Sequence, residues 1–172
     1  GLRPHAAVYL TDLARVLAQQ GPERHDEAAE TYRNALQQLD DGSSLQAELA
    51  MLEAGRGNNA EATQLFAAVL ATKPSAQNIR SQLVSSLLEA GENARAVEVA
   101  RKGIEIDPES ATAHHLLGRI EAKLKRPQRA VAPLTRAQEL DPTLPGIDGD
   151  LGEVLFLSGH HRRAEPALVR AT

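Results

Sequence analysis

Apolar and small residues recur along the chain at helical spacings, in blocks that glycine or proline separates. One block contains Leu83 and Leu87, four residues apart, which is the spacing of a single helical face. After a break at Gly91, a second block of the same period begins at Ala96. It ends before Pro108, because proline cannot continue a helix. The pattern predicts a helix, a tight turn, a second helix and a stop.

This unit repeats with a period of 34 residues. Ladders of like residues step by this period: Pro74, Pro108 and Pro142; Ala28, Ala62, Ala96, Ala130 and Ala164; Leu49, Leu83, Leu117 and Leu151; Tyr32, Phe66, Ala100, Leu134 and Leu168. Another ladder gives Gly57, Gly91 and Gly159, with Lys125 at the missing position. Since neither helix of a unit can bury its apolar stripe alone, neighbouring units must stack.

The pattern resembles the tetratricopeptide repeat family, whose unit has Leu-Gly, Ala, Ala and Pro at fixed positions. The fourth unit matches with Leu117-Gly118, Ala130, Ala137 and Pro142. The resemblance covers nearly the whole chain and implies an all-α fold, a right-handed superhelical α-solenoid of antiparallel helix-turn-helix repeats. We expect a single array over residues 1–172, with repeats at about 7–42, 43–76, 77–110, 111–144 and 145–172.

Several positions depart from this regular unit. The first turn, residues 22–25, carries a two-residue insertion. Pro133 and Pro166 fall inside second helices and should kink them or delay their start. The glycines at 146, 149 and 152 lower helix propensity, so the first helix of the fifth unit should start late.

Small residues are expected where the two helices of one unit touch. Gly118 should face Ala130, and Gly152 should face Ala164. The sequence stops inside the last helix without a polar capping helix, which predicts a fragment of a larger protein. Part of an apolar face should then be open, formed by Leu155, Leu157, Leu168 and Val169. This open face could support self-association.

Composition narrows the class of protein. Hydrophobic residues make up 42% of the chain and aromatic residues 2%, so the core must consist of closely packed Ala, Leu and Val. The absence of cysteine excludes disulfides and Cys-based metal sites. A net charge of −4 argues against nucleic-acid binding, and no apolar run approaches the length of a membrane span. The many Arg and Ala residues suggest a GC-rich bacterium. This fragment contains no signal peptide, and the sequence leaves the location open between the bacterial periplasm and the cytoplasm.

The resemblance implies that the first helix of each unit lines a concave groove that binds a partner. The candidate groove residues are Asp12, Arg15, Glu48, Met51, Gln82, Ser85, Glu89, His115, Arg119, Lys123 and Glu153. Their mixed charges suit a peptide or partner helix with its own charge pattern. The Lys and Asn set with which chaperone-binding relatives hold a C-terminal carboxylate is missing, so that ligand is not expected.

Other chemistry has little support. Adjacent helical residues point in different directions, so the pairs His114-His115 and His160-His161 predict no metal site. The cluster Lys123, Lys125, Arg126 and Arg129 is either a solvated turn or a site for an acidic partner, a phosphate or an anionic polysaccharide. No nucleophile motif or glycine-rich phosphate loop is found, so neither enzymatic activity nor a cofactor is expected.

The sequence therefore predicts a protein-protein interaction scaffold that binds a peptide or partner protein. In a GC-rich bacterium such arrays resemble segments of secretion or exopolysaccharide-export assemblies. The alternative is an accessory domain of a larger enzyme, such as a glycosyltransferase, whose catalytic part lies outside these residues.

Overall fold

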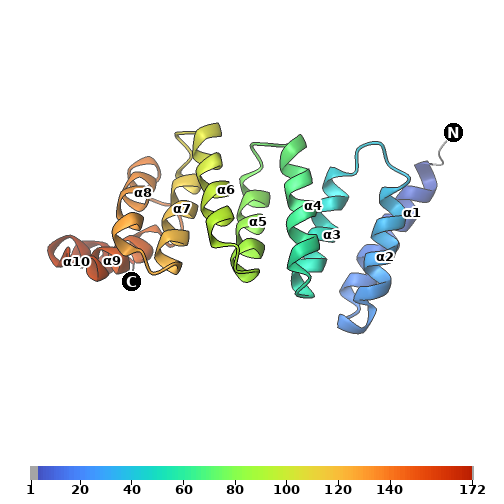
Figure 1. Cartoon of the computed structure of the whole chain (residues 1–172), viewed down its shortest axis with the longest axis horizontal. Coiled ribbons are helices and arrows are strands. Elements are labelled where there is room, and N and C mark those ends of the chain that lie inside the picture. The colour runs from blue at the N-terminus through green and yellow to red at the C-terminus, as the bar shows by residue number, and fades with distance from the viewer. Residues whose placement is uncertain (1–3, 172) are drawn as a thin grey trace. The chain divides into compact units, whose positions relative to one another are not determined.

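The computed structural model describes residues 4–171, which form ten α-helices, a short 3-10 helix and no β-strand (Figure 1). The α-helices are α1 (Pro4–Gln19), α2 (His25–Leu36), α3 (Ser43–Gly55), α4 (Asn59–Thr72), α5 (Gln77–Glu89), α6 (Asn93–Ile106), α7 (Ala111–Lys123), α8 (Pro127–Leu140), α9 (Ile147–Leu157) and α10 (His161–Arg170). The 3-10 helix Pro22–Arg24 occupies the predicted insertion in the first turn. The all-α fold class predicted from the sequence is confirmed.

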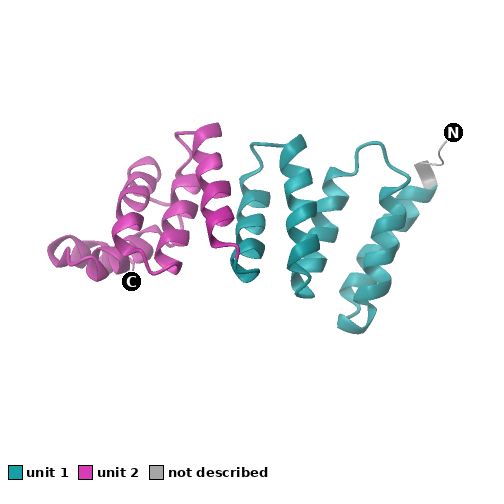
Figure 2. Cartoon of the chain, in the orientation of Figure 1, with its two compact units in different colours: residues 1–91 teal, residues 92–172 magenta. Residues whose placement is uncertain are grey.

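The chain divides into two compact units, residues 1–91 with α1–α5 and residues 92–172 with α6–α10 (Figure 2). The boundary follows Gly91 and falls inside the third predicted repeat. In unit 1, α1 packs on α2 and α3 on α4; in unit 2, α7 packs on α8 and α9 on α10. Each of these pairs is a helical hairpin. The prediction that all residues act as one array stays a prediction.

The repeat period is visible in where the helices begin. The helices α2, α4, α6, α8 and α10 begin at residues 25, 59, 93, 127 and 161, each 34 residues after the last. The alanines of the 34-residue ladder, one in each of these helices, are all buried. Side chains this small let the helix backbones approach closely, so a core poor in aromatic residues is still dense.

The turns after α3, α5, α7 and α9 each contain a residue in the left-handed conformation. Gly57, Gly91 and Gly159 have φ between 77° and 81°, which glycine adopts without strain. The next amide then returns to the first helix: the Asn58 N–H donates to the Glu53 carbonyl at 2.9 Å. This bond satisfies a carbonyl that the helix end leaves open. The glycine ladder read from the sequence is thus a ladder of helix C-caps.

Lys125 takes the glycine position in the α7–α8 turn, with φ of 60°. A left-handed conformation costs a non-glycine residue roughly 1–2 kcal/mol. Lys125→Gly should therefore raise the free energy of unfolding by about 1 kcal/mol, measured by urea denaturation. Lys125→Ala is the matched control, because it removes the same charge but keeps the Cβ. A gain of equal size for alanine would contradict the explanation from backbone strain.

The prolines were predicted to kink their helices or delay their start, and the starts are not delayed. Helix α8 begins at Pro127 and continues through Pro133, and α10 begins at His161 and continues through Pro166. Both starts keep the 34-residue spacing. The carbonyls that these prolines leave without a donor belong to Arg129 and Arg162, four residues earlier. Because both arginines are exposed, water can bond to these carbonyls.

The late start expected for the fifth first helix is observed. Helix α9 begins at Ile147 and has 11 residues, whereas α3, α5 and α7 have 13 each. Gly146, directly before it, has φ of 81°. Here the glycine redirects the backbone into the helix, which therefore starts two residues later than the 34-residue period gives.

Two glycines of unit 2 lie where their hairpin leaves no room for a side chain. A Cβ added to Gly118 would lie 2.4 Å from Leu134 Cγ, and one added to Gly152 would lie 2.7 Å from Leu168 Cγ. Ala130 and Ala164, predicted to face these glycines, are buried but lie one helical turn before those leucines. The leucines, which are longer side chains, fill the space above each glycine.

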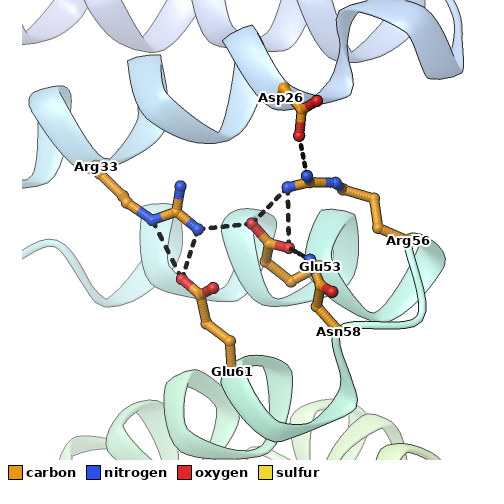
Figure 3. Close-up of polar contacts among 6 residues, drawn as sticks. All are labelled: Asp26, Arg33, Glu53, Arg56, Asn58 and Glu61. Carbon is orange, nitrogen blue, oxygen red and sulfur yellow. Dashed lines mark hydrogen bonds and ion pairs between the residues drawn. The ribbon is translucent and has the colours of Figure 1, made fainter.

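A buried polar network joins two hairpins of unit 1 (Figure 3). The Glu53 side chain on α3 is fully buried, and its carboxylate accepts bonds from Arg33 Nη2 at 2.8 Å, Arg56 Nη1 at 2.8 Å and Asn58 Nδ2 at 2.6 Å. Arg33 also donates to Glu61, and Arg56 to Asp26. The network thus connects α2, α3 and α4 around one carboxylate.

Unit 2 carries a looser version of this arrangement 68 residues later. Glu121 is buried on α7, and its oxygens lie 3.6 Å from Arg126 and 4.0 Å from Arg101. The pairs Arg33–Glu53 and Arg101–Glu121 have the same sequence spacing. Charged contacts between neighbouring repeats therefore recur with a period of two repeats.

Candidate functional site

The first helices of unit 1 border a pocket of about 350 Å³. It is lined by α3, the end of α4, the connection to α5 and the start of α5: Ser43, Ser44, Ala47, Glu48, Met51, Val69, Lys73, Ala76, Asn78, Ile79 and Gln82. Three of the predicted groove residues, Glu48, Met51 and Gln82, come together here. Exposed Met51 gives this pocket an adaptable apolar surface.

Glu48 is the polar centre beside this pocket. Arg15 on α1 donates to both Glu48 oxygens, at 2.7 Å and 2.8 Å, in the forked geometry that arginine and carboxylate prefer. Tyr32 Oη also donates to Glu48, at 3.2 Å. The bonds from Arg15 lower the pKa of the Glu48 carboxyl. Glu48 is therefore ionised at neutral pH and ties α1 to α3.

Burial, together with the nearby Glu48 charge, raises the pKa of Tyr32 to about 12. A tyrosine in an unfolded chain has a pKa of about 10. Because the folded value is higher, this contribution to stability is complete below about pH 10 and is lost as the pH rises towards 12. In a Tyr9→Phe variant, tyrosinate absorbance should report Tyr32 alone, with a midpoint near pH 12. Adding Glu48→Gln should lower that midpoint; a midpoint near 10 with Glu48 present would contradict the assignment.

A second pocket, of about 520 Å³, lies between α7 and α9 in unit 2. It is lined by Arg119, Ala122, Lys123, Lys125, Pro127, Asp150, Glu153, Val154 and Leu157. The predicted groove residues Arg119, Lys123 and Glu153 come together here. Val154 is buried at the base, whereas Leu157 is 58% exposed. The pocket combines an apolar floor with charged walls.

His115, also predicted to line the groove, lies at the base of this region and is buried. Its Nε2 lies 2.6 Å from Asp150 Oδ2, and Arg119 Nε lies 3.6 Å from the same oxygen. These contacts hold α7 against α9 and occupy Asp150. His115 therefore positions a wall of the pocket and has little surface for a partner.

The remaining predicted residues lie outside both pockets. Asp12 is exposed on α1 and lies 3.6 Å from Arg15. Ser85 and Glu89 are exposed on α5. Their role in partner binding stays a prediction.

Several residues of the pockets were not among the candidates. Leu157 occupies the same repeat position as Lys123, so the position rule was sufficient to find it. Lys125 and Lys73 lie in the turns after α7 and after α4, outside the first helices, so the position rule does not include them. Lys125 was named only as a member of the basic cluster, and Lys73 had no signal. Turn residues therefore contribute to both pockets, although most of the lining residues lie on helices.

The histidine pairs and the basic cluster separate into different environments. His114 Nε2 lies 2.9 Å from the Pro108 carbonyl, and His161 contacts the Phe156 ring edge-on, with centroids 5.0 Å apart. Of the basic cluster, Lys123 and Lys125 line the pocket, while Arg126 lies beside Glu121. Among the described residues no group of three His, Cys, Asp or Glu side chains could hold a metal ion. None of the described helices has the length and apolarity needed to cross a bilayer.

Solved structures with this fold come from several bacteria. MamA of Desulfovibrio magneticus RS-1 superimposes with a TM-score of 0.77 at 17% identity, covering 99% of this chain and 95% of that one. A tetratricopeptide repeat protein of Parabacteroides merdae gives a TM-score of 0.79 at 15% identity, covering 97% and 66%. A thermophilic TPR protein of Thermus thermophilus gives 0.65 at 21%, covering 96% and 90%. At such identities the likeness shows the fold alone.

Sequence comparison finds one family model that matches part of the chain. The family model described as tetratricopeptide repeat matches residues 81–145, whereas no curated protein matches the chain. The matched segment contains the Leu-Gly, Ala and Pro positions of the fourth unit, and the same 34-residue period continues on both sides. The resemblance read from the sequence is confirmed: residues 81–145 match the tetratricopeptide repeat model, and the chain has the fold of solved tetratricopeptide repeat proteins.

Proposed function

We propose that the protein is a non-enzymatic interaction scaffold that holds a peptide or partner protein against its first helices. Tetratricopeptide arrays generally offer extended surfaces to other proteins. The observation that carries the proposal is that each unit has a pocket lined by first helices, α3 and α5 in unit 1 and α7 and α9 in unit 2. Both pockets mix apolar floors with a few charged groups, which is the usual composition of binding sites.

Site-specific photo-crosslinking in the cells that make this protein tests the proposal. Benzoylphenylalanine would replace Met51 or Lys123 in the pockets, and Gln64 or Lys102 on the second helices α4 and α6 as matched exposed positions. Adducts with the same partner should form from at least one pocket position and not from the second helices. Adducts from the second helices alone, or none from the pockets, would contradict the proposal.

Self-association is a further proposal, which rests on the surface of α9 and α10. A hollow of about 430 Å³ there is lined by Phe156, His161, Ala164, Glu165, Leu168 and Val169. Phe156 and Leu168 are exposed, as are Leu157 and Val169, whereas Leu155, predicted to be open, is buried. Light scattering after size exclusion should then give a mass above the 18.5 kDa monomer, and Leu168→Asp should restore the monomer. A monomeric wild type at all concentrations would exclude this arrangement.

The two finer assignments from the sequence belong to the same scheme. If the protein is a scaffold of a secretion or exopolysaccharide-export assembly, the partner is a component of that assembly. If it is an accessory domain of an enzyme, the partner is the catalytic domain of the same protein. The identity of the crosslinked partner separates them, because an adduct with a component of an export assembly supports the first and an internal adduct the second.

A further inference from the structure

The pocket between α7 and α9 contains charges that the protein itself does not neutralise. The side chains of Lys123, Lys125 and Glu153 make no ion pair or hydrogen bond with any other described residue. The other two charged groups of the pocket, Arg119 and Asp150, lie 3.6 Å apart, and Asp150 is also bonded to His115. Two uncompensated positive charges therefore stand together at the α7–α8 turn, opposite one uncompensated negative charge on α9.

The floor beneath these charges is apolar. Val154 closes the base, Ala122 and Pro127 lie towards the turn, and Leu157 presents more than half of its surface to solvent. A volume of about 520 Å³ lies within the range of ligand pockets and holds a large aliphatic side chain with the backbone around it. Burying Leu157 against such a side chain would remove apolar surface from water.

We propose that this pocket binds an acidic peptide segment that carries a large aliphatic side chain. The aliphatic side chain packs on Val154 and Leu157, and the carboxylates of the segment lie at Lys123 and Lys125. The inference rests on the proposed function and adds the chemistry of the partner. Complementary charge favours encounter and fixes the direction of the segment, while apolar contact supplies affinity.

The same walls disfavour a polyanion. An anionic polysaccharide places charge along its whole length, so it would meet Glu153 on α9 as well as the two lysines. It also has no large aliphatic group for the floor at Val154 and Leu157. A peptide can be acidic at one end of the pocket and neutral or basic at the other, which matches both walls.

Isothermal titration calorimetry with three synthetic peptides tests the inference. The probe is acetyl-Glu-Glu-Leu-Leu-Asp-Glu-amide; one comparison peptide has lysine in place of each acidic residue, and the other has serine in place of each leucine. The acidic leucine peptide should bind with a dissociation constant on the order of 10–100 µM, and its affinity should fall as salt is added. Both comparison peptides should bind at least about tenfold more weakly.

Charge-reversal variants locate the binding. The double variant Lys123→Glu, Lys125→Glu should bind the acidic peptide about tenfold more weakly or worse, because two attractions become repulsions. The matched control, Arg95→Glu with Lys102→Glu on α6, makes the same change in net charge away from the pocket and should leave the affinity unchanged. Leu157→Ser should also weaken binding, which tests the apolar floor.

The outcomes separate this inference from the function it rests on. No measurable binding of the acidic peptide, equal binding of the lysine peptide, or indifference to the lysine reversals overturns the inference. Tighter binding of alginate than of the acidic peptide, lost in the same lysine variant, assigns the site to a polysaccharide and also overturns it. In each case adducts from Met51 or Lys123 in the crosslinking experiment would leave the scaffold function standing.

Discussion

Glu53→Ala should lower the free energy of unfolding by about 3 kcal/mol. The Glu53 carboxylate is fully buried and accepts bonds from Arg33, Arg56 and Asn58. Removing it leaves these donors without their shared acceptor and opens a cavity between α2, α3 and α4. The side chains of Arg33 and Arg56 are partly exposed and can bond to water in the variant. The loss of unfolding free energy is therefore at the lower end of the range for a broken buried ion pair.

Urea denaturation followed by circular dichroism measures this loss. The matched control is Glu98→Ala, the same change at an exposed position on α6, which should alter stability by less than about 0.5 kcal/mol. Glu53→Leu should lower the free energy of unfolding by less than Glu53→Ala does. Leucine occupies the equivalent buried position in other repeats, at Leu17, Leu87 and Leu155. Equal stability of the alanine variant and the wild type would mean that the network only fills space.

Gly118→Ala should destabilise the protein by about 2 kcal/mol, although alanine is the better helix former. The new Cβ would lie 2.4 Å from Leu134 Cγ, and Leu134 is completely buried, so its side chain cannot turn out into solvent. The helices α7 and α8 would have to move apart. Overpacking of this kind exceeds the gain in helix propensity.

Gly149→Ala is the control with the opposite sign. This glycine also lies in a first helix, α9, but a Cβ added there meets only Ala171 Cβ at 3.8 Å, an ordinary contact. Alanine should stabilise α9 by up to about 1 kcal/mol through its higher helix propensity. If both alanine variants were more stable than the wild type in thermal or urea unfolding, the close approach of Gly118 and Leu134 would be wrong.

The repeat period was sufficient to predict the elements of this fold. Ladders such as Ala28 to Ala164 and Gly57 to Gly159 follow directly from packing and from helix ends, so spacing alone locates the helices and turns. The prolines do not delay their helices, because packing in the repeat holds a helix start that an isolated helix would lose. Pro133 lies in a helix whose start is fixed by packing on α7 and by the preceding turn.

The pockets were predictable only in part. The position rule found Glu48 and Lys123 because first helices face the pockets, but it gave no information about the turn residue Lys125. It also placed His115 on the groove surface, since it cannot indicate that Asp150 binds the ring 35 positions later. The repeat period gives the positions of helices and turns. It does not give the rotamers and distances that decide which side chains pair between repeats.

The buried network of unit 1 did have a signal in the sequence. Glu53 and Glu121 interrupt a ladder that is otherwise Leu17, Leu87 and Leu155, and arginines precede both at the same distance. A charged residue in an apolar ladder, with an opposite charge at a constant offset, indicates a buried ion pair. The structure places that pair between hairpins.

Hydrogen–deuterium exchange of the protein, alone and bound to its crosslinked partner, tests the central claim most directly. If the first helices hold the partner, binding should slow amide exchange in α3 and α5, or in α7 and α9, and leave the exposed sides of α4 and α8 unchanged. Protection confined to the second helices would place the partner on another surface and contradict the account.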